Sequence, residues 1–336
     1  MKAAVLRGPE IIKTETVDYP EVPDDGIVIR VKACGVCGSD LHVYKEGKPE
    51  GTIFGHEFSG DVVEVGSNVS GIRVGERVTA AGFRPCGQCF WCGQNKFHRC
   101  SNPELTGYQL PGAMAEYVSI PIAIAGQTVF KLPEELSYED GASVEPLSIS
   151  LFSVKRGRPK QGDTAAVLGL GVIGINAIQA LKALGVSRVL ASGRRAPRLD
   201  AAEKSGADLV IDAARQDVMA AVMDGTSGMG VDMVVECAGS PVTFGQATEM
   251  VRGGGKVLLV GIFEQSLTWD PMEVIRKNIT LVGCLGGNFP GAIELIRSGK
   301  AATGHLVTHR FPLDDAAEAF RVQLRDQNAI KVMIIP

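Results

Sequence analysis

The stretch Ala165-Ala166-Val167-Leu168-Gly169-Leu170-Gly171-Val172-Ile173-Gly174 decides the fold of this 336-residue chain. An apolar run enters a G-x-G-x-x-G pattern, and a helix-like segment follows it. In such a turn the first Gly permits the bend, the second lets a pyrophosphate approach, and the third allows close helix packing. We therefore predict a dinucleotide-binding turn in which Gly169, Gly171, Val172, Ile173 and Gly174 meet the cofactor.

Five more apolar runs, separated by helix-like segments, follow this turn at residues 189–192, 209–211, 233–236, 256–260 and 280–284. Strands that alternate with helices predict a doubly wound parallel α/β sheet. The first half alternates in short strands instead, as at residues 26–32, and the last strand, residues 330–335, can return to that half. We expect a Rossmann cofactor domain over residues 151–286, inserted in a mostly-β domain of residues 1–150 that residues 287–336 complete.

The second apolar run ends in Ser192-Gly193-Arg194-Arg195, where an NAD site carries an acidic residue for the ribose 2′-hydroxyl. A small Gly and two guanidinium groups leave room for a 2′-phosphate and can bind it bidentately. We predict NADP(H) rather than NAD(H) as the cofactor. The alternative is that Arg194 and Arg195 are solvated loop charges. Asp200 comes too late to replace the missing acid and is expected inside the next helix.

Four cysteines follow a C-x2-C-x2-C-x7-C spacing, at Cys86, Cys89, Cys92 and Cys100. Two overlapping C-x2-C steps and a fourth Cys a short loop later suit a closed, tetrahedral, structural zinc site. Zinc is favoured over disulfides or free thiols because the chain shows no export signal.

Composition and charge exclude several classes of protein. The net charge is −4, with Lys and Arg scattered along the chain, so neither nucleic acid nor a membrane surface is an expected partner. No segment is apolar enough to span a membrane, and the N-terminus lacks a signal-peptide core. We expect a cytoplasmic protein.

Two further segments, Cys37-Gly38-Ser39-Asp40-Leu41-His42 and Gly55-His56-Glu57, could form a second metal site. With Glu145-Pro146-Leu147, the four-Cys segment and the Gly-rich turn, they resemble the zinc-dependent medium-chain dehydrogenase/reductase family, which includes alcohol, sorbitol and threonine dehydrogenases. The resemblance covers essentially the whole chain. It implies a GroES-like catalytic domain that carries the structural zinc lobe, and two zinc ions per chain.

By this resemblance Cys37 and His56 are ligands of a catalytic zinc, with one position open to water or substrate. Either Glu57 or Glu145 supplies the third protein ligand, and sequence spacing leaves the choice open. In polyol dehydrogenases the carboxylate of the Gly-His-Glu segment binds zinc while the later Glu holds the water, which favours Glu57.

The resemblance also assigns the proton path. Ser39 would face the reacting oxygen, His42 would end the relay to solvent, and Asp40 would orient His56. A turn hydroxyl and a surface histidine are the alternatives for Ser39 and His42. Lys331 matches a basic position that reaches the cofactor pyrophosphate in relatives, and a solvated lysine is the alternative.

The function expected is reversible hydride transfer between NADP(H) and an alcohol or ketone, the alcohol being secondary or a polyol. Zinc-independent reduction of enones or quinones and a non-catalytic NADPH-binding or scaffolding role are the alternatives. Tyr44, Phe54 and Phe83 are candidates for lining the substrate pocket. A homotetramer or homodimer is expected by resemblance alone.

Overall fold

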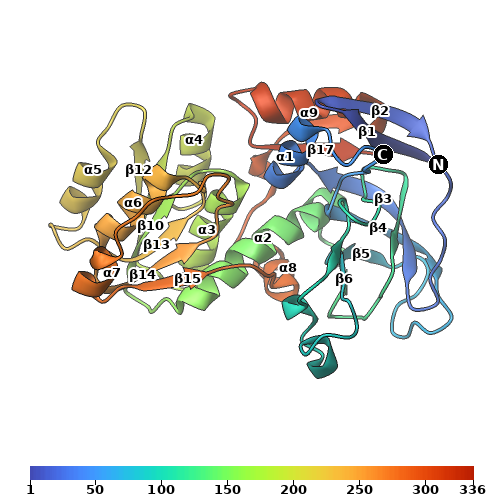
Figure 1. The fold of residues 1–336 in the computed structure, drawn as a ribbon, viewed down its shortest axis with the longest axis horizontal. Helices are drawn as coiled ribbons and strands as arrows, with labels where there is room; N and C mark the ends of the chain where they lie inside the picture. Colours follow the sequence, from blue (N-terminus) through green and yellow to red (C-terminus); the bar gives the residue numbers. More distant parts are fainter. The chain divides into compact units, whose positions relative to one another are not determined.

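The computed structural model describes residues 1–336, apart from the side chain of His98. The chain forms two compact units, Met1–Glu145 with Val307–Pro336, and Pro146–Leu306 (Figure 1). The second unit is therefore inserted in the sequence of the first. Each unit has its own sheet and its own core.

The unit boundaries differ from the expected ones, which fall after residues 150 and 286. The helix α2 (Tyr138–Gly157) runs through the first boundary. Residues 287–306, which include α8 (Phe289–Arg297), group with the inserted unit. Two hydrogen bonds donated by the main chain explain this grouping. The Asn288 N–H donates to the Ser148 carbonyl at 3.1 Å, and the Ala302 N–H donates to the Gln179 side-chain oxygen at 2.7 Å.

The inserted unit contains the predicted six-stranded parallel sheet, in the order β12-β11-β10-β13-β14-β15. Numbered along the chain this order is 3-2-1-4-5-6, the doubly wound arrangement of dinucleotide-binding folds. The strands are β10 (Thr164–Leu168), β11 (Arg188–Gly193), β12 (Leu209–Asp212), β13 (Val231–Glu236), β14 (Val251–Leu259) and β15 (Thr280–Gly283).

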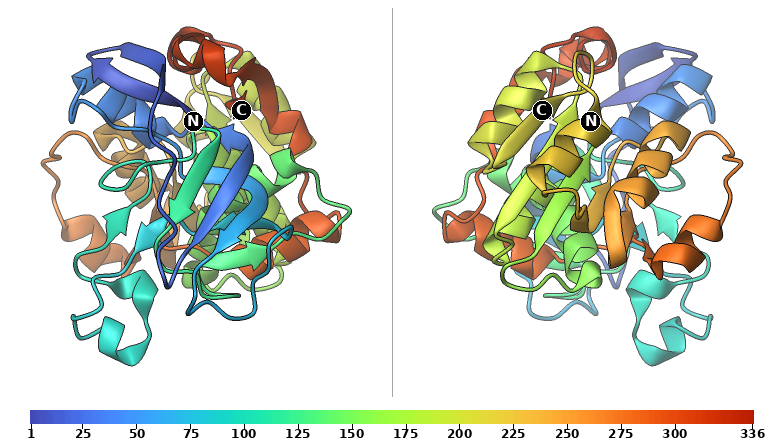
Figure 2. Two further views of the ribbon diagram at one scale, coloured as in Figure 1. Left: turned by 90° about the vertical axis from the view of Figure 1, so that its right-hand side faces the viewer. Right: turned by 90° about the vertical axis from the view of Figure 1, so that its left-hand side faces the viewer.

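Two groups of helices pack on this sheet (Figure 2). One group is α3 (Val172–Ala183) and α4 (Ala196–Lys204), which touch each other and strands β10 to β12. The other is α5 (Val218–Gly225), α6 (Pro241–Met250) and α7 (Met272–Lys277). Residues 165–168 are fully buried, as expected for a parallel strand covered on both faces. The strand order reverses between β10 and β13, the place where such sheets bind their ligands.

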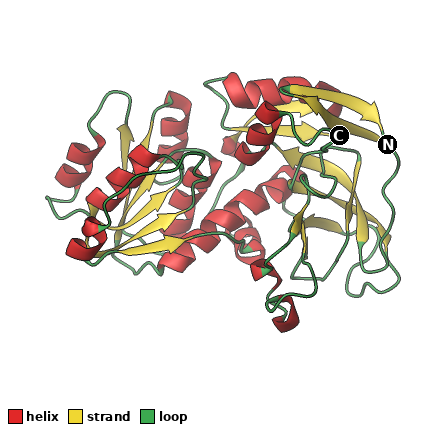
Figure 3. Ribbon diagram, viewed as in Figure 1, coloured by secondary structure: helices red, strands yellow, loops and turns green.

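The first unit is mostly β, as the sequence predicts (Figure 3). Its main sheet has seven strands in the order β16-β17-β3-β4-β5-β9, with β8 also paired to β3. Its elements are β1 (Lys2–Gly8), β2 (Ile11–Thr16), β3 (Ile27–Gly35), α1 (Gly38–Glu46), β4 (Glu57–Val65), β5 (Arg77–Ala80), β6 (Phe83–Arg84), β7 (Glu104–Leu105), β8 (Tyr117–Ile120), β9 (Val129–Lys131), β16 (Val307–Pro312), α9 (Ala316–Arg325) and β17 (Lys331–Ile335).

The core of this unit lies between the main sheet, α1 and α9. Tyr44 and Phe54 are part of it, contrary to the expectation that they line a substrate pocket. Their rings lie 5.0 and 5.2 Å from the ring of Phe320, and less than 2 % of either residue is exposed. The Tyr44 hydroxyl donates to the Glu10 carbonyl. Across the described residues, no helix has the length and hydropathy needed to cross a membrane.

Candidate functional site

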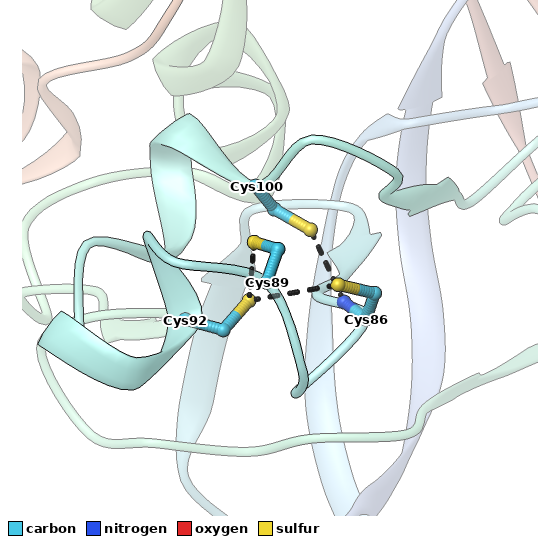
Figure 4. Close-up of side chains that lie close together, drawn as sticks. All are labelled: Cys86, Cys89, Cys92 and Cys100. Carbon is cyan, nitrogen blue, oxygen red and sulfur yellow. Dashed lines mark hydrogen bonds between the residues drawn. The ribbon is translucent and has the colours of Figure 1, made fainter.

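The four predicted lobe cysteines converge in the segment between β6 and β7 (Figure 4). Their sulfur atoms all lie within 4.8 Å of one another, and none of the four forms a disulfide. The Cys86 N–H donates to the Cys100 sulfur at 3.2 Å. Backbone N–H groups of Ser101 and Cys92 lower the pKa of Cys89 to about 6, which favours its thiolate. Four convergent sulfurs on a short loop fit a tetrahedral zinc ion.

A second cluster forms where β3 leads into α1 and β4 begins. Gly35 pairs with Glu57 in the antiparallel β3–β4 ladder, so Cys37, two residues later, comes beside His56. The ligand atoms of Cys37, His56 and Glu57 all lie within 4.8 Å of one another. A thiolate, an imidazole and a carboxylate that converge in this way fit a zinc ion bound at about 2.0–2.3 Å per ligand.

Asp40 lies directly behind this cluster and is fully buried. Its Oδ2 accepts the Cys37 N–H at 3.0 Å, and its Oδ1 lies 3.5 Å from His56 Nδ1. This geometry leaves His56 Nε2 as the ring nitrogen available to a metal. The contacts are those expected of a residue that orients a metal-binding histidine.

Glu57 and Glu145 differ in their surroundings. Glu57 offers an oxygen to the three-residue cluster, and its Oε2 pairs with the ammonium group of Lys331. Burial raises the pKa of Glu145 to about 7, with His56 acting in the opposite direction. Of the two carboxylates, Glu57 is the one whose ligand atom groups with Cys37 and His56.

Lys331 is buried, which excludes the solvated lysine named as the alternative. It is the first residue of β17, which pairs with β3, and only 5 % of the residue is exposed. Its ammonium group donates to Glu57 and, at 3.0 Å, to the Val36 carbonyl. Because its charged end is enclosed and bonded to Glu57, Lys331 is not a solvated lysine. It contacts the metal cluster through this carboxylate.

Ser39 and His42 lie three residues apart on α1, so they share a face of the helix. The Ser39 hydroxyl donates to the Cys37 sulfur at 3.1 Å. His42 is half-buried. The structure therefore brings Ser39 into direct contact with a predicted ligand, and His42 follows one turn later.

Sequence analysis missed Tyr108. Its ring lies 5.7 Å from the His56 ring, at an angle of 32°. No pattern in Leu105-Thr106-Gly107-Tyr108 points to this role, because the contact arises from the folding of a loop beyond the cysteine lobe.

The Gly-rich turn has the conformation that the sequence predicts. Gly169 has φ +95°, and a Cβ there would meet the Ala238 backbone at 2.7 Å. A Cβ on Gly174 would lie 1.9 Å from the Gly169 carbonyl, which explains the third glycine. A Cβ on Gly171 would meet no atom within 4 Å, so open space lies where a phosphate is expected.

Three arginines gather after β11, at the expected position of the cofactor's ribose. Arg194 is exposed, Arg195 is the N-cap of α4, and Arg198 lies in the first turn of that helix. Burial and the nearby charge of Arg195 lower the pKa of Arg198 to about 10. Asp200 lies inside α4, as expected. A Cβ on Gly193 would lie 2.8 to 3.1 Å from Leu170, so a side chain there disturbs the glycine-rich turn itself.

Two family profiles match the chain. The alcohol dehydrogenase GroES-like domain covers residues 23–134, and the zinc-binding dehydrogenase domain covers residues 172–298. The sorbitol dehydrogenase of Bacillus subtilis is 34% identical over 347 residues, covering 100% of this chain and 97% of the relative. The (R,R)-butanediol dehydrogenase of the same organism is 35% identical, with 100% of both chains covered. A zinc-binding dehydrogenase structure from Sinorhizobium meliloti, solved with NADP bound, has a TM-score of 0.90 at 31% identity and covers 100% of this chain and 99% of that chain.

Proposed function

The chain belongs to the zinc-type medium-chain dehydrogenase/reductase family, and from that premise we propose that it catalyses reversible, zinc-dependent hydride transfer between a secondary alcohol or polyol and NADP(H). Alcohol oxidoreduction with zinc and a nicotinamide cofactor follows from the family. The names of the two Bacillus subtilis relatives, a sorbitol and a butanediol dehydrogenase, support a substrate that carries a secondary hydroxyl.

The convergence of Cys37, His56 and Glu57 carries the proposal. These residues would hold the catalytic zinc, and Glu145 would hold the water that occupies the open position. When bound, zinc would polarise the alcohol oxygen and NADP⁺ would accept the hydride. The lobe cysteines would hold a second, structural zinc, which makes two per chain.

The remaining roles belong to side chains around the cluster. Ser39 would take the proton of the substrate hydroxyl, and His42 would pass it toward solvent. Asp40, whose Oδ1 lies 3.5 Å from His56 Nδ1, would orient the ring of His56. Arg194 and Arg195 would bind the 2′-phosphate of NADP(H), a site that lacks the acidic residue of an NAD enzyme. A homodimer or homotetramer remains a prediction.

The test is substitution of the ligands. Cys37→Ala and His56→Ala should each abolish oxidation of secondary alcohols, lower the zinc content from about two to about one per chain, and leave NADPH binding intact. Cys284→Ala, a buried cysteine of the inserted unit, is the matched control and should keep both zincs and activity.

The same measurement separates the alternatives. A zinc-independent enone or quinone reductase and a scaffolding protein would each bind one zinc in the wild-type chain. If Cys37→Ala or His56→Ala still oxidised alcohols, catalysis would not depend on a zinc ion at this cluster.

A further inference from the structure

Glu236 is a fully buried carboxylate of the inserted unit that has no part in the roles proposed above. It is the last residue of β13, and in the sheet it pairs with Leu168, the last residue of β10. These two strands are neighbours where the strand order reverses. In doubly wound sheets the ligand crevice opens beyond the carboxyl ends of the strands at that place. Glu236 therefore lies at the edge of the expected cofactor crevice.

The Glu236 side chain binds the loop that follows its own strand. Its Oε1 accepts hydrogen bonds from the backbone N–H groups of Ala238 and Gly239, both at 2.9 Å, and from the Thr243 hydroxyl at 2.7 Å. Its Oε2 accepts a longer bond from the Gly239 N–H at 3.2 Å. Because three donor groups meet one carboxylate, this side chain sets the conformation of residues 237–240.

The loop at residues 237–240 packs against the glycine-rich turn. A Cβ on Gly169 would lie 2.7 Å from the Ala238 nitrogen and 2.9 Å from the Ala238 Cα. The Cys237 N–H donates to the Leu168 carbonyl at 2.8 Å, which joins the two segments directly before the turn. A shift of this loop would therefore disturb the turn that is expected to meet the pyrophosphate.

The loop that follows β14 also depends on Glu236. The N–H groups of Val260 and Gly261 both donate to the Glu236 carbonyl at 2.9 Å. A Cβ on Gly261 would lie 2.3 Å from the Gly239 nitrogen and 2.8 Å from the Glu236 Oε2, so the two loops are in close contact. Through its side chain and its carbonyl, Glu236 thus connects the loops after three neighbouring strands, β10, β13 and β14.

We propose that Glu236 is a positioning residue for the nicotinamide cofactor: it holds residues 237–240 in the conformation that keeps the glycine-rich turn and the adjoining crevice ready for binding. This inference rests on the cofactor part of the proposed function, and it predicts an effect different from that of the arginines after β11. Arg194 and Arg195 would meet the 2′-phosphate, which only NADP(H) carries. The crevice at the boundary of β10 and β13 would receive the part that NADH and NADPH share.

The test is titration of folded protein with NADPH and with NADH, measured as Kd for the wild-type chain, Glu236→Leu and Glu236→Gln. Glu236→Leu removes the acceptor oxygens, so the loop must be ordered when the nucleotide binds. We expect Kd for both nucleotides to rise by the same factor, about 5- to 20-fold. Glu236→Gln keeps one carbonyl oxygen that can replace Oε1, so both Kd values should return to within about threefold of wild type.

Thr243→Val tests the same contact if Glu236→Leu does not fold. It removes one of the three donor groups and keeps the shape of the side chain, so Kd for both nucleotides should rise about two- to fivefold. The matched control is Thr248→Val on the same helix, α6, because the buried Thr248 hydroxyl donates to the Gly245 carbonyl of its own helix. This control should leave both Kd values unchanged.

Hydrogen exchange of cofactor-free protein measures these contacts without a nucleotide. Glu236→Leu should speed the exchange of the Ala238 and Gly239 amides, because their acceptor is lost. Thr248→Val should not change the exchange of either amide.

Wild-type affinity for both nucleotides in folded Glu236→Leu or in Thr243→Val would overturn the proposal, since the side chain would then only stabilise the fold. A loss confined to NADPH would also overturn it, because the affected site would be that of the 2′-phosphate. If the wild-type chain preferred NADH, the proposed choice of NADP(H) would fail. An equal loss of both affinities in Glu236→Leu would still support the role of Glu236 in that case.

Discussion

Lys331 and Glu57 form an ion pair that is almost closed to solvent, with 5 % and 2 % of the two residues exposed. They are 274 positions apart in sequence, and β3 joins them because it pairs with β4 on one side and with β17 on the other. The ammonium group of Lys331 offsets the negative charge of the Glu57 carboxylate and fixes its orientation. No local pattern could show this pairing, which depends on strand order.

Lys331→Met should therefore destabilise the zinc-free protein by about 3–5 kcal/mol, because it leaves a buried carboxylate without its partner. The double variant Lys331→Met with Glu57→Gln should be more stable than the single variant, since the charge is removed together with its partner. Urea unfolding of zinc-free protein measures both. Lys2→Met, which breaks the exposed pair with Asp314, is the control and should not change the unfolding midpoint.

If the double variant were as unstable as Lys331→Met alone, the loss would come from packing of the lysine stem and not from the ion pair.

Elements with a strong local pattern could be predicted from the sequence, and contacts made by folded loops could not. The strand, glycine turn and helix at residues 164–183 follow from an apolar run and three glycines whose roles are local. The cysteine lobe follows from spacing alone. Tyr108 and Lys331 needed the tertiary fold, and Tyr44 and Phe54 were misjudged because proximity in sequence to metal-site residues does not reveal which face of an element is buried.

Among the structural elements, the lobe between β6 and β7 has little regular structure of its own. It consists of short helical turns around four convergent sulfurs. Four thiolates would close the coordination of a zinc ion in this lobe and leave no position for a substrate. Cys92→Ser should reduce zinc to about one per chain and lower thermal stability, while folded molecules keep kcat within about twofold. Metal analysis and activity per folded chain measure this, with Cys284→Ser as the control.

Loss of hydride transfer in a still-folded Cys92→Ser protein would contradict this division between a structural and a catalytic metal.

At the scale of the whole molecule, the chain is two compact units with separate cores. The sequence predicts this insertion, but its far boundary differs because residues 287–306 bond to α2 and α3 of the inserted unit. The proposed phosphate-binding arginines and the glycine turn all lie in that unit, whereas the metal cluster lies in the other. Cofactor preference should therefore be measurable as a binding property, independent of the catalytic zinc.

We expect NADPH to stabilise the protein against thermal unfolding more than NADH does at the same concentration. A ligand present at 100 times its Kd stabilises the folded state by about 2.7 kcal/mol, so a tenfold weaker ligand gives a clearly smaller shift in Tm. Replacing Arg194 and Arg195 by Ala should remove the advantage of NADPH, because both charges that would face the 2′-phosphate are lost. These substitutions avoid Gly193, where any side chain would strike Leu170. Arg297→Ala, which removes an exposed charge on α8, is the control. If NADH and NADPH stabilised the wild-type chain equally, the site would not prefer NADPH. Arg194 and Arg195 would then be solvated charges that do not bind a 2′-phosphate.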